Sequence, residues 1–80
     1  MPKLTIQYFA ILREQRGLAR EQLDTPATTP AALYEELRAR HRFTLPSDRV
    51  RAAVNGDFVA ADAPLAEGDE LTFIPPVAGG

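Results

Sequence analysis

The sequence predicts a two-layer α+β domain in which one main helix covers one face of a mixed sheet. Three observations support this fold class: an alternating strand pattern near the start, one well-capped helix in the middle, and a strong hairpin signal in the second half. Eighty residues correspond to one small domain. No repeat, low-complexity stretch or internal linker divides the chain.

The first strand is predicted from Lys3 to Ala10, where apolar and polar residues alternate. A strand places successive side chains on opposite faces of a sheet. The apolar set therefore shares one face, which we expect to be buried: Leu4, Ile6 and Tyr8.

A short helical turn and a weak strand are expected next. The alternation is broken by three apolar residues: Phe9, Ile11 and Leu12. The segment 11–16 is predicted to be helical and to end at Gly17, because glycine readily adopts the left-handed conformation that closes a helix. Residues 20–23 form a weak strand, which is predicted mainly because the first strand needs an antiparallel neighbour.

The main helix has clear start and stop signals. Thr29 is suited to accept a hydrogen bond at the N-cap, and Pro30 fits the first helical position, where no N–H is needed. The helix should end near Arg42, before Pro46. One stripe of the helix is apolar and should face the core: Leu33, Tyr34 and Leu37.

The second half contains the remaining strands. Residues 50–54 form a strand, and Asn55-Gly56 favours a tight hairpin turn because both central positions of that turn need positive φ. Phe58-Val59 begins the return strand. The last strand is expected over 70–74, where two prolines that lack an N–H end the pairing.

Composition excludes several classes of function. The net charge is −2 and the basic residues form no stripe, which argues against nucleic-acid binding. The absence of cysteine excludes disulfides, thiolate catalysis and iron–sulfur clusters, and the lone His41 is expected at the end of the main helix and not as a metal ligand. There is no signal-peptide pattern and no apolar run of membrane-spanning length, so a cytoplasmic protein is expected.

The C-terminus is the most informative functional feature. We divide the chain into a domain, 1–74, and an extended flexible tail, 75–80, that ends in Gly79-Gly80. Glycine has no Cβ, so another protein can close around the tail and reach the terminal carboxylate. Six extended residues span on the order of 20 Å. The sequence therefore predicts a carboxyl group that is presented to the active site of another protein.

Several motifs resemble a known family along nearly the whole chain. The matching segments are Phe9-Ala10 with Leu12-Arg13-Glu14 and Gly17, then Ala53-Val54-Asn55, Pro64-Leu65, Gly68-Asp69-Glu70-Leu71, and the ending Phe73 with Pro75-Pro76-Val77 and Gly79-Gly80. The chain resembles the small sulfur-carrier subunit of molybdopterin synthase, a ubiquitin-like β-grasp family. Two positions depart from the family pattern: Leu71, where valine is frequent, and Ile74, where an aromatic residue is common.

The resemblance implies a specific chemistry and specific partners. An E1-like activating enzyme would use ATP to adenylate the Gly80 carboxylate, and a sulfurtransferase or cysteine desulfurase would then supply sulfur to form a thiocarboxylate. The large synthase subunit would receive the tail and use this sulfur for molybdopterin, in a heterotetramer. The small subunit would itself have no catalytic site and would hold no cofactor or metal. The family also implies partner contacts through Arg13 and through the segment Phe73, Ile74, Pro75, Pro76, Val77, Ala78, Gly79 and Gly80.

Three other functions are consistent with the residues. The chain could carry sulfur for another pathway, such as thiamine synthesis, or it could be a ubiquitin-like modifier whose Gly80 carboxyl is joined to lysines of other proteins. It could also be a β-grasp binding module with an incidental Gly-Gly ending. Extending the chain beyond Gly80 would abolish the first two functions and leave the third intact.

Overall fold

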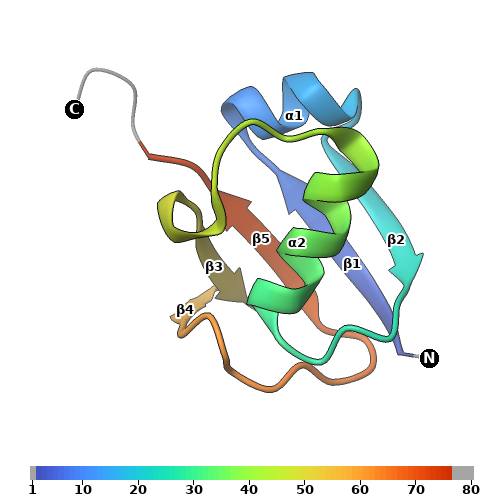
Figure 1. The fold of residues 1–80 in the computed structure, drawn as a ribbon. Helices are drawn as coiled ribbons and strands as arrows, with labels where there is room; N and C mark the ends of the chain where they lie inside the picture. The colour runs from blue at the N-terminus through green and yellow to red at the C-terminus, as the bar shows by residue number, and fades with distance from the viewer. Residues whose placement is uncertain (1, 77–80) are drawn as a thin grey trace.

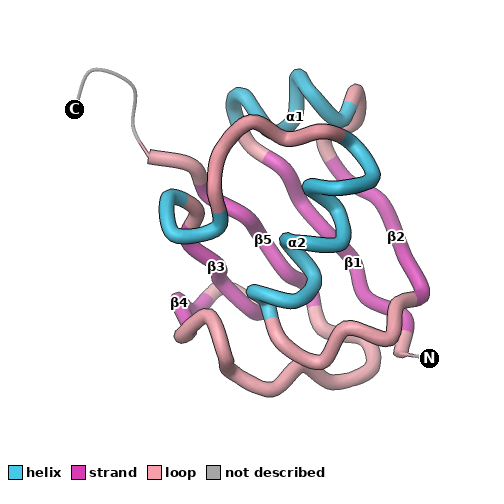
Figure 2. Tube along the Cα trace, viewed as in Figure 1, coloured by secondary structure: helices cyan, strands magenta, loops and turns pink. Residues whose placement is uncertain are grey.

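The computed structural model describes residues 2–76 and contains a five-stranded sheet with helices packed on one face (Figures 1 and 2). The strand order is β2-β1-β5-β3-β4. The central strands β1 and β5 run parallel, and the other neighbouring pairs are antiparallel. The predicted two-layer α+β fold with a mixed sheet is therefore confirmed. The strands are β1 (Lys3–Tyr8), β2 (Arg20–Asp24), β3 (Arg51–Val54), β4 (Asp57–Val59) and β5 (Glu70–Ile74).

Both predicted helices form, with the predicted caps. Helix α1 (Ala10–Arg16) ends at Gly17, whose φ of 86° is left-handed. Helix α2 (Pro30–His41) begins after Thr29, whose side chain accepts a hydrogen bond from the backbone N–H of Ala32 at 3.2 Å. A 3₁₀ turn (Ser47–Arg49) lies between α2 and β3, and the sequence pattern did not predict it.

The core lies between the sheet and α2. Aromatic rings occupy its middle: Tyr34 packs edge-on against Phe73 and stacks with Phe43, at centroid distances of 5.3 and 5.9 Å. The buried faces of β1 and β5 match the predicted alternation, whereas β3 buries two consecutive residues, Ala52 and Ala53. Fully buried side chains include Leu4, Ile6, Tyr8, Leu12, Leu33, Leu37, Leu71 and Phe73.

The Asn55-Gly56 turn is tied to the start of β5. Both residues have positive φ, 52° and 93°, as predicted for this hairpin. The Asn55 side chain donates to Asp69 Oδ1 and accepts from the backbone N–H of Glu70, both at 3.0 Å. These bonds hold the β3–β4 hairpin against the strand that leads to the tail.

Candidate functional site at the root of the C-terminal tail

The tail leaves the domain from the end of β5, in the middle of the sheet. Phe73 is buried in the core, and Ile74 lies on the opposite face of the strand and is partly exposed. The prediction that one of these two residues enters the core is confirmed. Pro75 is buried and Pro76 is exposed, so the chain emerges from the body of the domain at Pro76.

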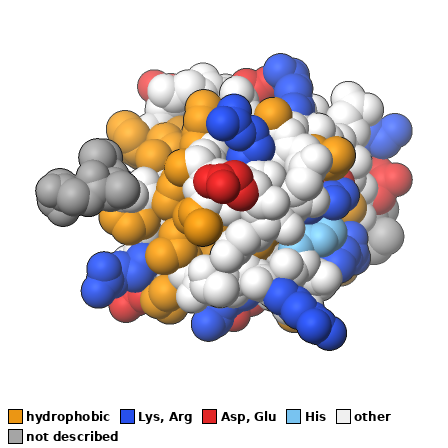
Figure 3. Space-filling model, turned by 90° about the horizontal axis from the view of Figure 1, so that it is seen from above, with side chains coloured by type: hydrophobic (Ala, Val, Ile, Leu, Met, Phe, Trp, Pro, Cys, Tyr) orange, Lys and Arg blue, Asp and Glu red, His pale blue; other side chains and the backbone are white. Residues whose placement is uncertain are grey.

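An open apolar groove of about 550 Å³ lies beside this exit point. It is formed by three segments that are distant in the sequence: the start of α1, the loop after α2, and the end of β5. Figure 3 shows hydrophobic side chains gathered on this part of the surface. The residues that line the groove are Phe9, Ala10, Ile11, Glu14, Leu45, Ile74, Pro75 and Pro76.

Helix α1 presents apolar side chains to the groove because one residue anchors it in the core and a sharp turn joins it to β1. Leu12 is its only buried residue and anchors the helix in the core. Ala10 has a φ of 51°, a left-handed conformation that turns the chain sharply from β1 into α1. Phe9 and Ile11 are left 42% and 40% exposed, which is unusual for large apolar side chains that are placed side by side.

A partly buried ionic cluster fixes the far end of α1 to β1 and β2. Glu21 accepts hydrogen bonds from Tyr8 Oη at 2.6 Å and from Nε and Nη2 of Arg16, both at 2.8 Å. The Arg16 hydrogen bonds lower the pKa of Glu21. Burial, with the Glu21 hydrogen bond as a second cause, raises the pKa of Tyr8 well above its usual range. We call these three residues the Glu21 cluster.

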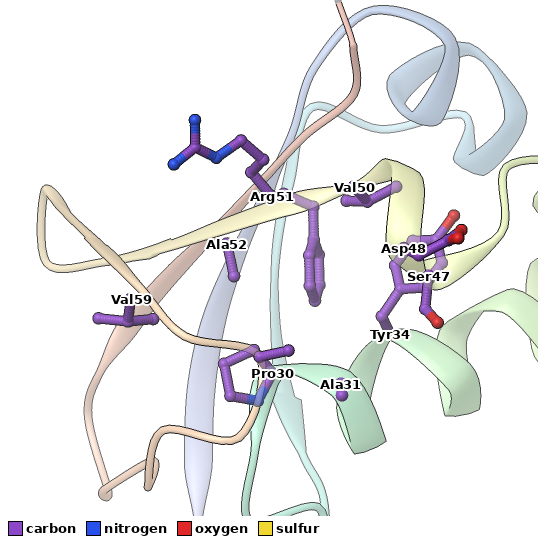
Figure 4. A pocket seen from close by; sticks show the side chains of 11 residues that line it. Pro30, Ala31, Tyr34, Ser47, Asp48, Val50, Arg51, Ala52 and Val59 are labelled. Carbon is purple, nitrogen blue, oxygen red and sulfur yellow. The ribbon is translucent and has the colours of Figure 1, made fainter.

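A second cavity, of about 360 Å³, lies between the start of α2 and β3 (Figure 4). Tyr34, Ala52 and Phe73 contribute to its lining. Arg51 also contributes, but its guanidinium lies 4.5 Å from the centroid of the exposed Phe58 ring and points away from the cavity in Figure 4. The lining residues include Ser47 and Asp48 but no histidine, and no hydrogen bond joins the Ser47 hydroxyl to the Asp48 carboxylate among the described residues, so this cavity does not show the serine–base pairing of a nucleophilic site.

Within residues 2–76, no group of acidic residues and histidine is arranged to hold a metal ion. His41 is the last residue of α2, where the sequence placed it.

None of the described helices has the length and apolar character needed to cross a membrane.

Only some of the predicted site residues line the groove. Ile74, Pro75 and Pro76 line the groove, whereas Phe73 supports it from the core. Arg13 is exposed on α1 and does not line the groove; the helix contributes Glu14 there instead. The predicted positions Val77, Ala78, Gly79 and Gly80 lie outside the described residues.

Sequence reasoning missed four apolar residues of the groove: Phe9, Ala10, Ile11 and Leu45. A signal for two of them was present, because Phe9 and Ile11 break the strand alternation without joining a helical core stripe. Leu45 had no such signal, since it reaches the groove from a loop.

The fold defines a ubiquitin-like β-grasp protein with an open apolar groove beside the end of its last described strand. Comparison with known proteins gives the family. The chain matches the ThiS family over residues 6–80 and belongs to it. It is 35% identical over 80 residues to the molybdopterin synthase sulfur carrier subunit of Escherichia coli (strain K12), covering 96% of this chain and 99% of that protein.

Solved structures agree with this assignment. The putative molybdopterin converting factor, subunit 1, of Pyrococcus furiosus is 32% identical with a TM-score of 0.80, covering 96% of this chain and all of that one. SAMP1 of Haloferax volcanii is 27% identical with a TM-score of 0.76, covering 98% and 99%. The same fold, at a TM-score of 0.67 and 20% identity over 98% and 99% of the chains, occurs in a complex of subunits 1 and 2 of the Helicobacter pylori molybdopterin-converting factor.

Proposed function

We propose that this chain is the sulfur-carrier subunit of molybdopterin synthase and that Gly80 carries the sulfur. An E1-like activating enzyme adenylates the Gly80 carboxylate with ATP, and a sulfur donor then displaces AMP to leave a thiocarboxylate. The tail delivers this group to the large synthase subunit, which transfers the sulfur to the molybdopterin precursor. The similarity to a named carrier subunit over 96% of the chain carries this proposal, together with the family match, which reaches residue 80.

The chemistry suits a protein without a catalytic centre. A carboxylate is a poor electrophile, and adenylation supplies the leaving group that a sulfur nucleophile can displace. The resulting thiocarboxylate is itself a sulfur nucleophile, so the chain needs no cysteine, and the sequence has none. The acids, bases and phosphate-binding groups are then supplied by the activating enzyme and the large subunit.

The groove is the proposed docking surface for these partners. It adjoins the point at which the tail leaves the domain, so a partner that covers it would also surround the tail. Clustered exposed apolar side chains are typical of protein–protein contact sites. Covering Phe9 and Ile11 removes apolar surface from water, and each such side chain contributes on the order of 1 kcal/mol or more to binding.

The proposed chemistry is tested by intact-protein mass. The chain is incubated with an activating enzyme, ATP and a sulfur source, and the C-terminal peptide is analysed. We expect a mass gain equal to the exchange of one oxygen for sulfur, located at Gly80. An unchanged mass under conditions that load a known carrier would contradict the proposal.

The docking surface is tested with two matched variants. Ile11 and Leu18 are 40% and 39% exposed, but only Ile11 lines the groove. We expect Ile11→Asp to weaken binding to a purified large subunit by on the order of tenfold or more, and Leu18→Asp to change it by less than about twofold. Calorimetry measures the affinity and circular dichroism checks the fold. Equal losses for both variants would show that the groove is not the docking surface.

The second candidate function is that of a protein modifier. The structural likeness to SAMP1, a small archaeal modifier protein, supports this candidate. Both functions begin with adenylation of Gly80, and they differ in the product. A carrier gives a thiocarboxylate and returns unchanged, whereas a modifier becomes joined to other proteins through an amide. Covalent adducts of the tagged chain that resist reducing agents would favour the modifier.

A further inference from the structure

The basic residues of this chain are almost all arginines. The sequence has eight arginines and a single lysine, Lys3. The distinction matters for an activated acyl group, because a lysine amine becomes a nucleophile when it loses its proton, whereas an arginine guanidinium stays protonated at all ordinary pH values. The chain therefore carries one side-chain amine that could attack its own activated C-terminus.

Lys3 lies at the end of the sheet opposite to the root of the tail. Strands β1 and β5 are parallel, and Thr5 pairs with Glu70. Lys3 lies two residues before Thr5 and Pro76 lies six residues after Glu70, so roughly 26 Å separates them at about 3.3 Å per residue. The start of β1 and the end of β5 are at opposite ends of the domain in Figure 1.

Backbone hydrogen bonds hold Lys3 at that remote position. Its N–H donates to Glu67 Oε1 at 3.0 Å, and its carbonyl accepts from the N–H of Gly68 at 2.8 Å. Both partners belong to the turn before β5. The lysine is therefore fixed to the beginning of the strand whose other end carries the tail.

The cation that the sheet register places beside the tail root is an arginine. Arg51 is the direct register partner of Ile74 on the neighbouring strand β3, and its side chain is exposed. This position carries positive charge close to the end of β5 without a nucleophilic amine.

We infer that this arrangement prevents the activated C-terminus from being consumed by the chain's own lysine, an inference that rests on the proposed function. In the side reaction, a lysine Nζ would attack the Gly80 carbonyl carbon of the acyl-adenylate. A C–N bond would form, the C–O bond to AMP would break, AMP would leave with the electron pair, and the amine would release a proton to solvent. The product would be a closed ring that cannot accept sulfur.

The distances exclude this reaction for Lys3. The four residues that follow Pro76 span at most about 14 Å when fully extended, and an extended lysine side chain adds about 6 Å from Cα to Nζ. The sum falls short of the roughly 26 Å between Pro76 and Lys3. A lysine at position 51 or 14 would lie beside the tail root and within reach.

The test uses the full chain with Gly80 converted to a thioester by intein cleavage, which requires no activating enzyme. Five proteins are compared at low concentration: the unchanged chain, Lys3→Arg, Arg51→Lys, Glu14→Lys and Asp24→Lys. Asp24→Lys adds a new amine at a remote site, since Asp24 pairs with Lys3. Mass spectrometry follows ring closure, which releases the thiol, against hydrolysis.

We expect Arg51→Lys and Glu14→Lys to close at least about tenfold faster than the other three proteins, because a nearby amine has a high effective concentration. Equal rates in all five proteins, or ring closure through Lys3 in the unchanged chain, would overturn the inference. Because the thioester is made chemically, this result is independent of the loading assay. A chain that is never loaded by an activating enzyme would contradict the proposed function and leave the ring-closure result readable.

Discussion

Replacing Glu21 by glutamine tests how firmly α1, the wall of the groove, is attached to the sheet. Glu21 accepts three hydrogen bonds of 2.6–2.8 Å from Tyr8 and Arg16, which joins β2 to β1 and α1. The side chains of Arg16 and Glu21 are only 24% and 15% exposed, so water replaces these bonds poorly. Glutamine keeps the shape of the side chain and removes its charge.

The expected loss is about 2 kcal/mol of unfolding free energy. A hydrogen bond to a charged group contributes about 1.5–3 kcal/mol net, and glutamine retains one acceptor oxygen and loses the bidentate contact with Arg16. A chain of this length has a total stability of roughly 4–12 kcal/mol. The substitution therefore removes a measurable share of the stability.

The effect should depend on pH in a defined direction. Hydrogen bonds from Arg16 hold the folded-state pKa of Glu21 below its ordinary value of 4.5. The unfolded chain therefore binds the proton more readily, and the stabilisation is fully present above this ordinary value. It is lost as the pH falls through the lowered folded-state pKa, so the difference between the two proteins should shrink there.

Urea denaturation followed by circular dichroism measures both effects. At neutral pH, the midpoint of Glu21→Gln should fall by about 1–2 M urea. Glu35→Gln is the control, because Glu35 forms only an exposed pair with Arg38 at 3.6 Å, and it should cost less than about 0.5 kcal/mol. Equal losses in the two variants, or a difference from the unchanged chain that persists in acid, would refute the reasoning.

Two further predictions concern the turn and the terminus. Asn55→Ala removes two side-chain hydrogen bonds and leaves a left-handed φ of 52° without its stabilising side chain, so Tm should fall by about 10 °C in a thermal melt; an unchanged Tm would contradict the role of the turn. One serine appended after Gly80 should abolish thiocarboxylate formation in the mass assay without changing Tm, and continued loading of the extended chain would contradict the proposed reaction at Gly80.

Local signals predicted those elements whose structure is fixed by nearby residues. Thr29 and Pro30 define the start of α2 through a hydrogen bond within one turn, and Asn55-Gly56 defines its hairpin through backbone conformation. Strand β2 gave a weak signal because it is an edge strand with a single apolar residue, Leu23, and its pairing with β1 determines its conformation.

The groove could not be predicted in the same way, because it depends on packing between distant segments. Leu45 reaches it from a loop that Tyr34 fixes by donating a hydrogen bond to the Leu45 carbonyl at 2.7 Å. Ala10 contributes through a backbone conformation that its residue type does not indicate. The extended tail over 75–80 stays a prediction, since residues 77–80 lie outside the described residues.

The position of β5 has a consequence for synthesis of the protein. It is the last strand of the chain, yet it lies between β1 and β3 and joins the two halves of the sheet. A ribosome must therefore complete nearly the whole polypeptide before the sheet can close, and a chain cut short before Glu70 would leave two unconnected strand pairs, neither stable alone. Termination before Glu70 thus removes the fold together with the reactive end, so such a truncated chain leaves no folded but inactive fragment.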